Sequence, residues 1–584
     1  SEKVLQDRLF AREKEGKVRI MWDHTLDEVL GDDSGVTGMR IKSVKDDSTT
    51  DIDLSGVFIA IGHKPNTDIF AGQLEMQNGY LTVTGGIEGN ATQTSVRLGI
   101  QESGIRDSIR DLLVDLHGQG FFVSEAELLD HVGSAPEDDP PEVATLAVPT
   151  CDRPELLEAC VRSFAANRRA HGRSYDLLVV DDSADPDTRE RCRAVLEAHA
   201  DGLPAWYAGP EEKNAFVAAL KEMGEGRFSP SSVDVLLGNP HGCDRTTGAN
   251  RNAALLHTVG DLMLSADDDV RVPPTRTPEW SPGLRVTGIH DSTEYHFFHS
   301  RGEVLEAADF EEVDAAALHE ALLGRSLASC IAAAPEDELD WDEMGDACLG
   351  ALLRNRGRVL LTAAGLAGDS GQVGSAYCLY PRPGQSFRRL LESEDYLSTR
   401  LSREVIRAAE VATISSGTQF MTPFAGIDNR ASVPPFFPVQ RNQDGLYART
   451  LRQVVPGGMI GSLPWAVAHE PPTARLQAEE DLYRTAMGVR TSDVIICLLS
   501  TARAGAHDDD VEARLQMLGH HYQDVGSLDA KAFEQYLKEA LWHYRGQDAG
   551  ILTVQLSQVA DAPDEWYEDS ERIVENVQAR MLDE

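Results

Sequence analysis

The sequence predicts an α/β protein whose main domain is a mostly parallel sheet with helices on both faces. From residue 143 to about residue 475, short apolar runs alternate with stretches of helical periodicity. That alternation is typical of parallel strands joined by crossover helices. The 584 residues suffice for several domains. Hydrophobic residues make up 41% and charged residues 26% of the chain, as in folded, soluble domains.

The chain changes character along its length, and we expect four segments: 1–96, 97–142, 143–475 and 476–584. The second segment reads as two helices and an acidic, proline-rich linker, with a Ser–x–x–Glu capping box opening a helix at Ser124–His131. The last segment is mainly helical. The apolar face of Glu571–Leu582 would pack internally or against a partner.

Individual elements follow from local patterns. In the first segment, strands are expected at Val18–Met21, Val36–Val44 and Val57–Ile61, with a turn at Gly31–Gly35. In the third segment, strands are expected at Ala144–Val148, Leu177–Val180 and Leu262–Ser265, and helices at Pro154–Asn167, Thr188–Ala198 and Asn250–Val259.

The charge balance narrows the function. The chain has 54 Lys and Arg against 96 Asp and Glu, a net charge of −42. This acidity argues against nucleic acid and against an anionic membrane surface as partners. We expect no membrane span, because no apolar run approaches about 18 residues. The eight cysteines form no CxxC pair, and a cytoplasmic location is the expectation.

Acidic residues follow two of the expected strands directly. Asp181 and Asp182 come after the second strand and Asp267–Asp269 after the third. Carboxyl ends of parallel strands share one sheet edge, where ligands bind. Two carboxylates at Asp–x–Asp spacing point the same way and suit Mg²⁺ or Mn²⁺. The alternative is a solvated turn or helix cap, which is our interpretation of Asp508–Asp510.

At this point residues 143–272 resemble family 2 glycosyltransferases with the GT-A fold. The motifs are a strand into Thr150–x–x–Arg153, a strand into Asp181-Asp182, the helix start at Arg251-Asn252, and Asp267–x–Asp269. The resemblance implies that Thr150, Arg153, Asp181, Asp182, Arg251 and Asp267 bind the donor. It implies that Asp267 and Asp269 hold the metal.

Two later residues are candidates for chemistry. Asp444 lies in Gln443-Asp444-Gly445, which resembles the late acidic motif that supplies the catalytic base. The alternative is an Asx turn before Gly445. Some GT-A enzymes use a late histidine as a further metal ligand, and His469 could serve, although a single histidine is more often structural. The group His290, His296 and His299 favours aromatic packing over zinc.

The first segment resembles part of a different enzyme. The stretches Phe58–Thr67 and Gly89–Ser95 are similar to bacterial thioredoxin reductase, and the similarity covers residues 1–96. The family's glycine-rich nucleotide fingerprints, its arginine pair and its redox CxxC are missing from the sequence. We therefore expect neither FAD nor NADPH to bind this segment. A fusion or join is expected at Val96–Arg97.

Together these observations predict a transferase that uses Mn²⁺ or Mg²⁺ to move a sugar from a nucleotide-sugar to an acceptor hydroxyl, with inversion. A UDP-sugar is the expected donor, and the acceptor is an unknown glycan, peptide or small molecule. Two alternatives stay open. One is an NADPH/FAD disulfide reductase, expected to be inactive as a fragment, and the other is a non-catalytic binding protein with a GT-A core.

Overall fold

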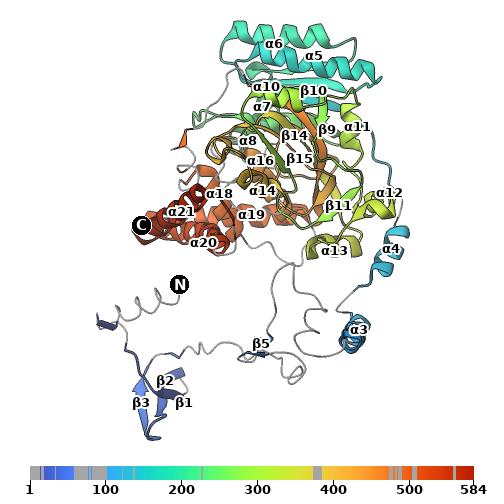
Figure 1. The fold of residues 1–584 in the computed structure, drawn as a ribbon. Helices are drawn as coiled ribbons and strands as arrows, with labels where there is room; N and C mark the ends of the chain where they lie inside the picture. The colour runs from blue at the N-terminus through green and yellow to red at the C-terminus, as the bar shows by residue number, and fades with distance from the viewer. Residues whose placement is uncertain are drawn as a thin grey trace. The chain divides into compact units, whose positions relative to one another are not determined.

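Figure 1 shows the computed structural model of residues 1–584. The structure describes part of the chain in each of the four predicted segments. The described residues are 13–14, 19–32, 35–54, 56–57, 76–77, 80–81, 102–120, 123–135, 138–224, 228–371, 384–471, 478–479, 483, 489–502, 510–556, 559 and 561–583. The chain divides into two compact units, Ser1–Val123 and Ser124–Glu584. The predicted boundaries at 96/97, 142/143 and 475/476 stay predictions.

The first unit contains a small antiparallel sheet. Its strands are β1 (His24–Asp32), β2 (Gly35–Ser43) and β3 (Thr49–Asp53), paired in that order. The hairpin between β1 and β2 falls at the predicted turn, where Gly35 has a φ of 122°, a conformation that favours glycine. This unit also holds β4 (Met76–Gln77), β5 (Tyr80–Leu81) and α3 (Glu102–Gly118).

The strand expected at Val18–Met21 is wrong for its described residues, because 19–21 are not in a strand and β1 begins at His24. Among the described residues, no strand lies beside residues 19–21 to pair with them. His24 pairs with Ser43, the last residue of β2, and the chain then turns, with Asp47 bonding back to Ser43. The motifs at 58–67 and 89–95 and the expected join at Val96–Arg97 lie outside the described residues.

The second unit is an α/β domain, which confirms the predicted fold class. In its described residues a 13-stranded sheet has the main order β13-β11-β16-β18-β14-β17-β9-β6-β7-β8. At one end β8 (Ala205–Ala208), β7 (Asp176–Asp181), β6 (Thr145–Thr150) and β9 (Leu262–Ala266) are parallel. β17 (Phe424–Asp428) then pairs with β9 in the antiparallel direction.

Helices cover both faces of this parallel end. Alternate residues along each strand are therefore buried, and they belong to two different clusters. Leu146, Val179 and Leu264 face α5 (Pro154–Ala170) and α6 (Pro186–His199). The intervening residues, such as Ala147, Val180 and Met263, face α9 (Thr247–His257) and α16 (Gln443–Val454) on the other side. Burial on both faces explains the nearly continuous apolar strands.

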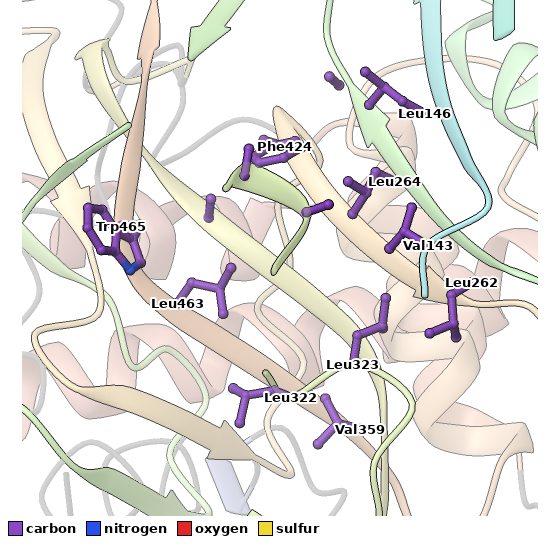
Figure 2. Packing of buried hydrophobic residues seen from close by; sticks show 14 of the residues in the cluster. Val143, Leu146, Leu262, Leu264, Leu322, Leu323, Val359, Phe424, Leu463 and Trp465 are labelled. Carbon is purple, nitrogen blue, oxygen red and sulfur yellow. The ribbon is translucent and has the colours of Figure 1, made fainter. Parts of the chain in front are cut away.

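The sheet continues into a second half. β14 (Arg358–Asp369) and β18 (Gly458–His469) run parallel, and β18 also pairs with β10 (Val270–Arg276) and β16 (Ala412–Ser415) in the antiparallel direction. Figure 2 shows one buried layer crossing from Leu264 through Phe424 to Leu463 and Trp465. One core therefore joins the two halves.

Outer strands and helices complete the second half of the sheet. They are β11 (Leu284–Thr287), β12 (Glu294–Phe298), β13 (Leu339–Asp340), β15 (Glu404–Ala408), α10 (Arg301–Ala307), α11 (Ala315–Glu320), α12 (Leu327–Ala333), α13 (Asp346–Leu353), α14 (Ser386–Leu391) and α15 (Tyr396–Thr399). The helices α7 (Pro210–Met223) and α8 (Pro230–Leu237) lie instead at the parallel end, where α7 contacts β8 and α8 contacts α9. The capping box at Ser124 is confirmed and opens α4 (Glu125–Gly133).

The C-terminal region is helical, as predicted, with α18 (Thr491–Thr501), α19 (Val511–Gly526), α20 (Ala530–Leu556) and α21 (Asp564–Asp583). The apolar face of α21 packs internally, since Ile573 and Val577 share a buried cluster with Tyr295 on β12. Asp510 caps α19 by accepting a bond from the Glu512 amide, which agrees with the cap interpretation. Asp508 and Asp509 lie outside the described residues. No described helix is both long and apolar enough to cross a bilayer.

Candidate functional site

The parallel strands place the acidic residues at one edge of the sheet, as the sequence predicts. Thr150 ends β6 and is directly opposite Asp181, which ends β7. Asp267–Asp269 follow β9, the other neighbour of β6. The three loops therefore meet where the carboxyl ends of parallel strands leave a crevice between crossover connections.

Asp268 is held by the protein itself. Its Oδ2 accepts a 2.7 Å bond from the Thr150 hydroxyl, and its Oδ1 accepts a 3.1 Å bond from Nη1 of Arg153. Burial and the neighbouring Asp269 carboxylate raise the pKa of Asp268 to about 7, against the opposing effect of Arg153. Thr150 and Arg153, predicted at the donor, thus lie against the acidic triplet.

Asp269 lies beside His469. The two are brought together by register, because Val270 at the start of β10 pairs with His469 at the end of β18. The Nε2 atom of His469 is 3.4 Å from Oδ1 of Asp269. Its Nδ1 is 2.5 Å from the backbone oxygen of Asp369, so Nδ1 carries the proton and Nε2 faces the carboxylate. Burial opposes the charged imidazole, but Asp269 outweighs it and raises the pKa of His469.

The donor set fits a divalent cation. His469 bonds a backbone carbonyl through Nδ1 and turns Nε2 toward Asp269, which is the orientation in which metal-ligating histidines are held. Adjacent ligand atoms of an octahedral ion lie about 3 Å apart, close to the 3.4 Å between Asp269 and His469. Within the described ranges, no group of three or more His, Cys, Asp or Glu is placed to share one ion. Substrate oxygens would therefore have to complete the coordination.

Arg251 supplies positive charge to the same place. It extends from the first turns of α9, and its Nη2 donates a 2.5 Å bond to Oδ1 of Asp267. Its Nε and Nη1 atoms are buried without a hydrogen-bond partner, and its guanidinium lies 5.9 Å from the Phe436 ring centre. Buried unpaired donors are costly. Arg251 therefore holds two polar atoms for which the described residues supply no hydrogen bond.

Asp267 is the accessible member of the triplet, with 32% of its side chain exposed. Burial of the rest raises its pKa to about 6, Arg251 lowers it, and Asp269 adds to the rise. A bound cation would favour the charged form of this carboxylate and so lower its pKa again.

Asp444 lies in the first turn of α16, close enough for its charge to raise the pKa of Asp267. Burial raises the pKa of Asp444 itself, while Arg251 and the Gly445 and Thr422 amides act in the opposite direction. The structure therefore brings the predicted base beside the predicted donor residues.

Asp181 and Asp182 are bound to protein groups. Asp181 accepts bonds from the Ser183 amide (2.7 Å) and hydroxyl (2.6 Å) and from the Tyr207 hydroxyl (2.7 Å). Asp182 accepts bonds from Lys213 and from the Thr246 hydroxyl. Lys213 also donates a 2.8 Å bond to Asn250 at the start of α9.

The sequence analysis missed Tyr207, Lys213 and Thr246. Lys213 is buried in the first turn of α7, shortly after β8 ends, and a lysine at that position was the one detectable signal. No local pattern in the sequence distinguishes Tyr207 or Thr246.

The start of α9 is fixed against the segment that leads to α16. Gly248 lies so close to the backbone that a Cβ there would be 1.9 Å from the Phe437 oxygen. Asn252 accepts a 2.7 Å bond from the Phe436 amide and donates a 3.0 Å bond to its oxygen. These contacts set the position of Arg251 relative to Asp444.

The three clustered histidines contact different partners. His290 lies 3.0 Å from the Thr418 hydroxyl, and His299 lies 3.2 Å from that of Ser398. Burial lowers the pKa of His296 to about 4, with the Arg389 charge adding to the effect. Nε2 of His296 lies 4.0 Å from Oε1 of Glu410, so each of the three histidines faces a different group.

Comparison with known proteins gives two separate likenesses. No family model matches the chain. Over 96 residues, 16% of this chain, the sequence is 57% identical to thioredoxin reductase of Vibrio cholerae. The chain spans 30% of that enzyme's length. The reductase resemblance of the first segment is therefore confirmed as a resemblance to part of that enzyme.

The second likeness is to solved structures. A mannosyltransferase from Pyrobaculum calidifontis in complex with GDP-Man and Mn²⁺ matches over 78% of this chain and 92% of its own, with 12% identity and a TM-score of 0.28. Mannosyl-3-phosphoglycerate synthase from Rubrobacter xylanophilus matches over 32% of this chain and 52% of its own, with 16% identity and a TM-score of 0.15. At such low TM-scores, function has to be argued from the contacts of this chain's own residues.

Proposed function

We propose that the second unit is a metal-dependent glycosyltransferase that moves a sugar from a nucleotide-sugar to an acceptor hydroxyl, with inversion at the anomeric carbon. One observation carries the proposal. Around one sheet edge lie a carboxylate–imidazole pair at 3.4 Å, a buried arginine with two unpartnered nitrogens, and a carboxyl with raised pKa. These are the groups that a diphosphate leaving group and an attacking hydroxyl require.

The donor's diphosphate would be held from two sides. Asp269 and His469 would hold Mn²⁺ or Mg²⁺. Asp267, which the described structure does not place to share one ion with them, would contact the donor and would have to turn its side chain to reach the metal. The bound cation would stabilise the negative charge that develops on the diphosphate. The free Nε and Nη1 atoms of Arg251 would donate to donor oxygens, satisfying groups that are orphaned in the free chain.

Asp444 would act on the acceptor. A base for inversion takes the proton of the attacking hydroxyl as the new bond forms. Burial raises the pKa of Asp444, and a raised pKa makes a carboxylate a better proton acceptor. Gln443 precedes it where the resembled family usually has Glu, so a single carboxylate would do this work.

The donor-binding roles of Thr150, Arg153, Asp181 and Asp182 are proposed on different grounds. Thr150 and Arg153 contact the triplet directly. Asp181 and Asp182 have their oxygens bonded to Tyr207, Ser183, Lys213 and Thr246, so they would shape the base and ribose pocket through these partners. A UDP-sugar remains the expected donor, and the acceptor stays open.

Two other functions are separable by experiment. The reductase alternative concerns a segment that spans 30% of its relative, and a purified chain without flavin absorbance would remove it. A non-catalytic binding protein would bind nucleotide-sugar with Mn²⁺ but release no nucleoside diphosphate.

The deciding experiment is a donor screen that measures nucleoside diphosphate release from several nucleotide-sugars with Mn²⁺, using the full chain. We expect release that depends on the metal. Asp444→Asn should keep donor affinity and lower turnover at least about a hundredfold, as removal of a general base does. Asp267→Ala with Asp269→Ala should abolish metal-dependent nucleotide binding, and unchanged binding in that variant would overturn the proposal.

A further inference from the structure

Arg153 contacts the acidic triplet through carboxylate oxygens other than the one that faces His469. Nη1 of Arg153 lies 3.1 Å from Oδ1 of Asp268 and 3.4 Å from Oδ2 of Asp269. The same Asp269 carboxylate faces His469 through its other oxygen, Oδ1. The arginine and the proposed cation would therefore share one carboxylate, and each would reduce the negative charge available to the other.

The backbone at Arg153 is fixed, whereas its side chain is partly free. Asp152 has a left-handed conformation, with a φ of 55°, and its amide donates a 2.8 Å bond to the Ser183 hydroxyl. Pro154 begins α5 directly afterwards, and the Arg153 side chain makes no capping bond to that helix. With 37% of this side chain exposed, the guanidinium can swing toward solvent without moving the backbone.

The two arginines at the triplet differ in this respect. Arg251 is 2% exposed and is fixed on Asp267 by a 2.5 Å bond from inside the fold. Arg153 approaches from the rim and holds both carboxylates through one nitrogen. The contacts of Arg153, at 3.1 and 3.4 Å, are longer than the 2.5 Å bond of Arg251, and its side chain is more exposed to the screening solvent. Arg153 is therefore the cation that the site can release.

We propose that Arg153 is a displaceable counter-ion, which neutralises Asp268 and Asp269 in the free chain, gives way when the divalent cation enters, and then pairs with the donor's diphosphate. This inference rests on the proposed function, because it takes the metal and the anionic donor from there. It adds a linkage: metal and donor each free Arg153 from the carboxylates, so each should strengthen the binding of the other.

The test is Mn²⁺ binding to the full chain, followed by the electron paramagnetic resonance signal of free Mn²⁺, without and with UDP. In Arg153→Gln the cation has no guanidinium to displace. Without nucleotide, we expect this variant to bind Mn²⁺ roughly fivefold more tightly than the unchanged chain does. A factor of this size corresponds to the loss of one partly exposed charge pair. The increase in Mn²⁺ affinity caused by UDP should become smaller in this variant.

The matched control is Arg169→Gln, which removes the same charge at the far end of α5. Arg169 is half exposed and pairs with Asp201 at 2.6 Å. Seventeen residues of helix place it roughly 24 Å along the axis from Arg153, well beyond the Debye length of about 8 Å at physiological salt. Its Mn²⁺ affinity should equal that of the unchanged chain.

The outcomes separate the two proposals. If the unchanged chain binds Mn²⁺ but Arg153→Gln binds it equally or more weakly, the counter-ion role is overturned and the transferase proposal stands. If the unchanged chain binds no Mn²⁺, both fall. Should circular dichroism show that Arg153→Gln is unfolded, Arg153→Met serves instead, because it also removes the charge. It should bind Mn²⁺ more tightly than the unchanged chain, and an affinity equal to that of the unchanged chain would overturn the inference.

Discussion

His469 lies with its Nε2 atom 3.4 Å from Oδ1 of Asp269, although two hundred residues separate them in the chain. The pairing of β10 with β18 produces this contact, and the backbone oxygen of Asp369 fixes the imidazole from behind. We expect His469→Ala to weaken Mn²⁺ binding by at least about tenfold, since disturbing even the groups that orient a ligand costs this much. A Mn²⁺ titration measures the effect.

The control for that variant is His171→Ala, an exposed histidine after α5. It should bind Mn²⁺ as the unchanged chain does. Equal affinity in His469→Ala and in the control would remove His469 from the metal site.

A substitution at Gly248 tests how closely α9 packs against the segment before α16. In Gly248→Ala the new methyl group would meet the Phe437 oxygen at 1.9 Å. We expect a loss of about 1–3 kcal/mol in unfolding free energy, because the backbone has to shift, together with weaker donor binding through Arg251. Thermal unfolding and nucleotide titration measure the two effects.

Gly519→Ala is the matched control, because a Cβ at this exposed position in α19 would meet nothing within 4 Å. It should stabilise the chain by roughly 0.8 kcal/mol through helix propensity. Equal destabilisation by both substitutions would show that the contact with Phe437 is not the cause.

Acid should destabilise the second unit through His319. Burial lowers the pKa of His319 to about 3, and its Nδ1 lies 2.7 Å from the Thr362 hydroxyl. The unfolded chain takes up the proton near pH 6.5 and the folded chain does not. Stability from this group is therefore present above pH 6.5 and is lost as the pH falls toward 3, by up to about 1.4 kcal/mol per pH unit.

The measurement is urea unfolding of the unchanged chain and of His319→Gln at several values between pH 7.5 and pH 5. The difference in unfolding free energy between the two proteins should shrink as the pH falls. A difference that stays constant over this range would contradict the assignment.

Asp569 should anchor α21 to the sheet. Its carboxylate, 4% exposed, accepts bonds from the hydroxyls of Tyr396 (3.0 Å) and Tyr483, and it lies 3.3 Å from Nε of Arg400. Asp569→Asn should cost about 3 kcal/mol, because it leaves the buried Arg400 with only the half-exposed Glu479 as a countercharge. Limited proteolysis should then release α21 first. Glu571→Gln, exposed on the same helix, should leave the cleavage pattern unchanged.

Much of the site could be predicted because it depends on local signals. Thr150, Asp181 and Asp267 each follow an apolar strand, and parallel strand ends must share an edge. The partners of Asp182 could not be predicted in this way. Lys213 and Thr246 reach it from 31 and 64 residues away, and only the packing of α7 and α9 decides that they meet.

The strand order in the second half of the sheet could not be predicted from local signals either. Its antiparallel strands, such as β17 between β9 and β14, do not follow from the alternation of strand and helix. The proximity of Asp444 and His469 to the triplet could be anticipated only through the glycosyltransferase resemblance. The register of Val270 with His469 then supplies the physical reason.

The position of β17 has a consequence for synthesis of the chain on the ribosome. β9 ends at Ala266, whereas β17, which covers its open edge, begins at Phe424. At about 5–20 residues per second, that edge waits roughly ten to thirty seconds for its neighbour. During this interval the nascent chain exposes an apolar strand able to pair with other chains. We expect its yield in cells to depend on holding chaperones more than its final stability suggests.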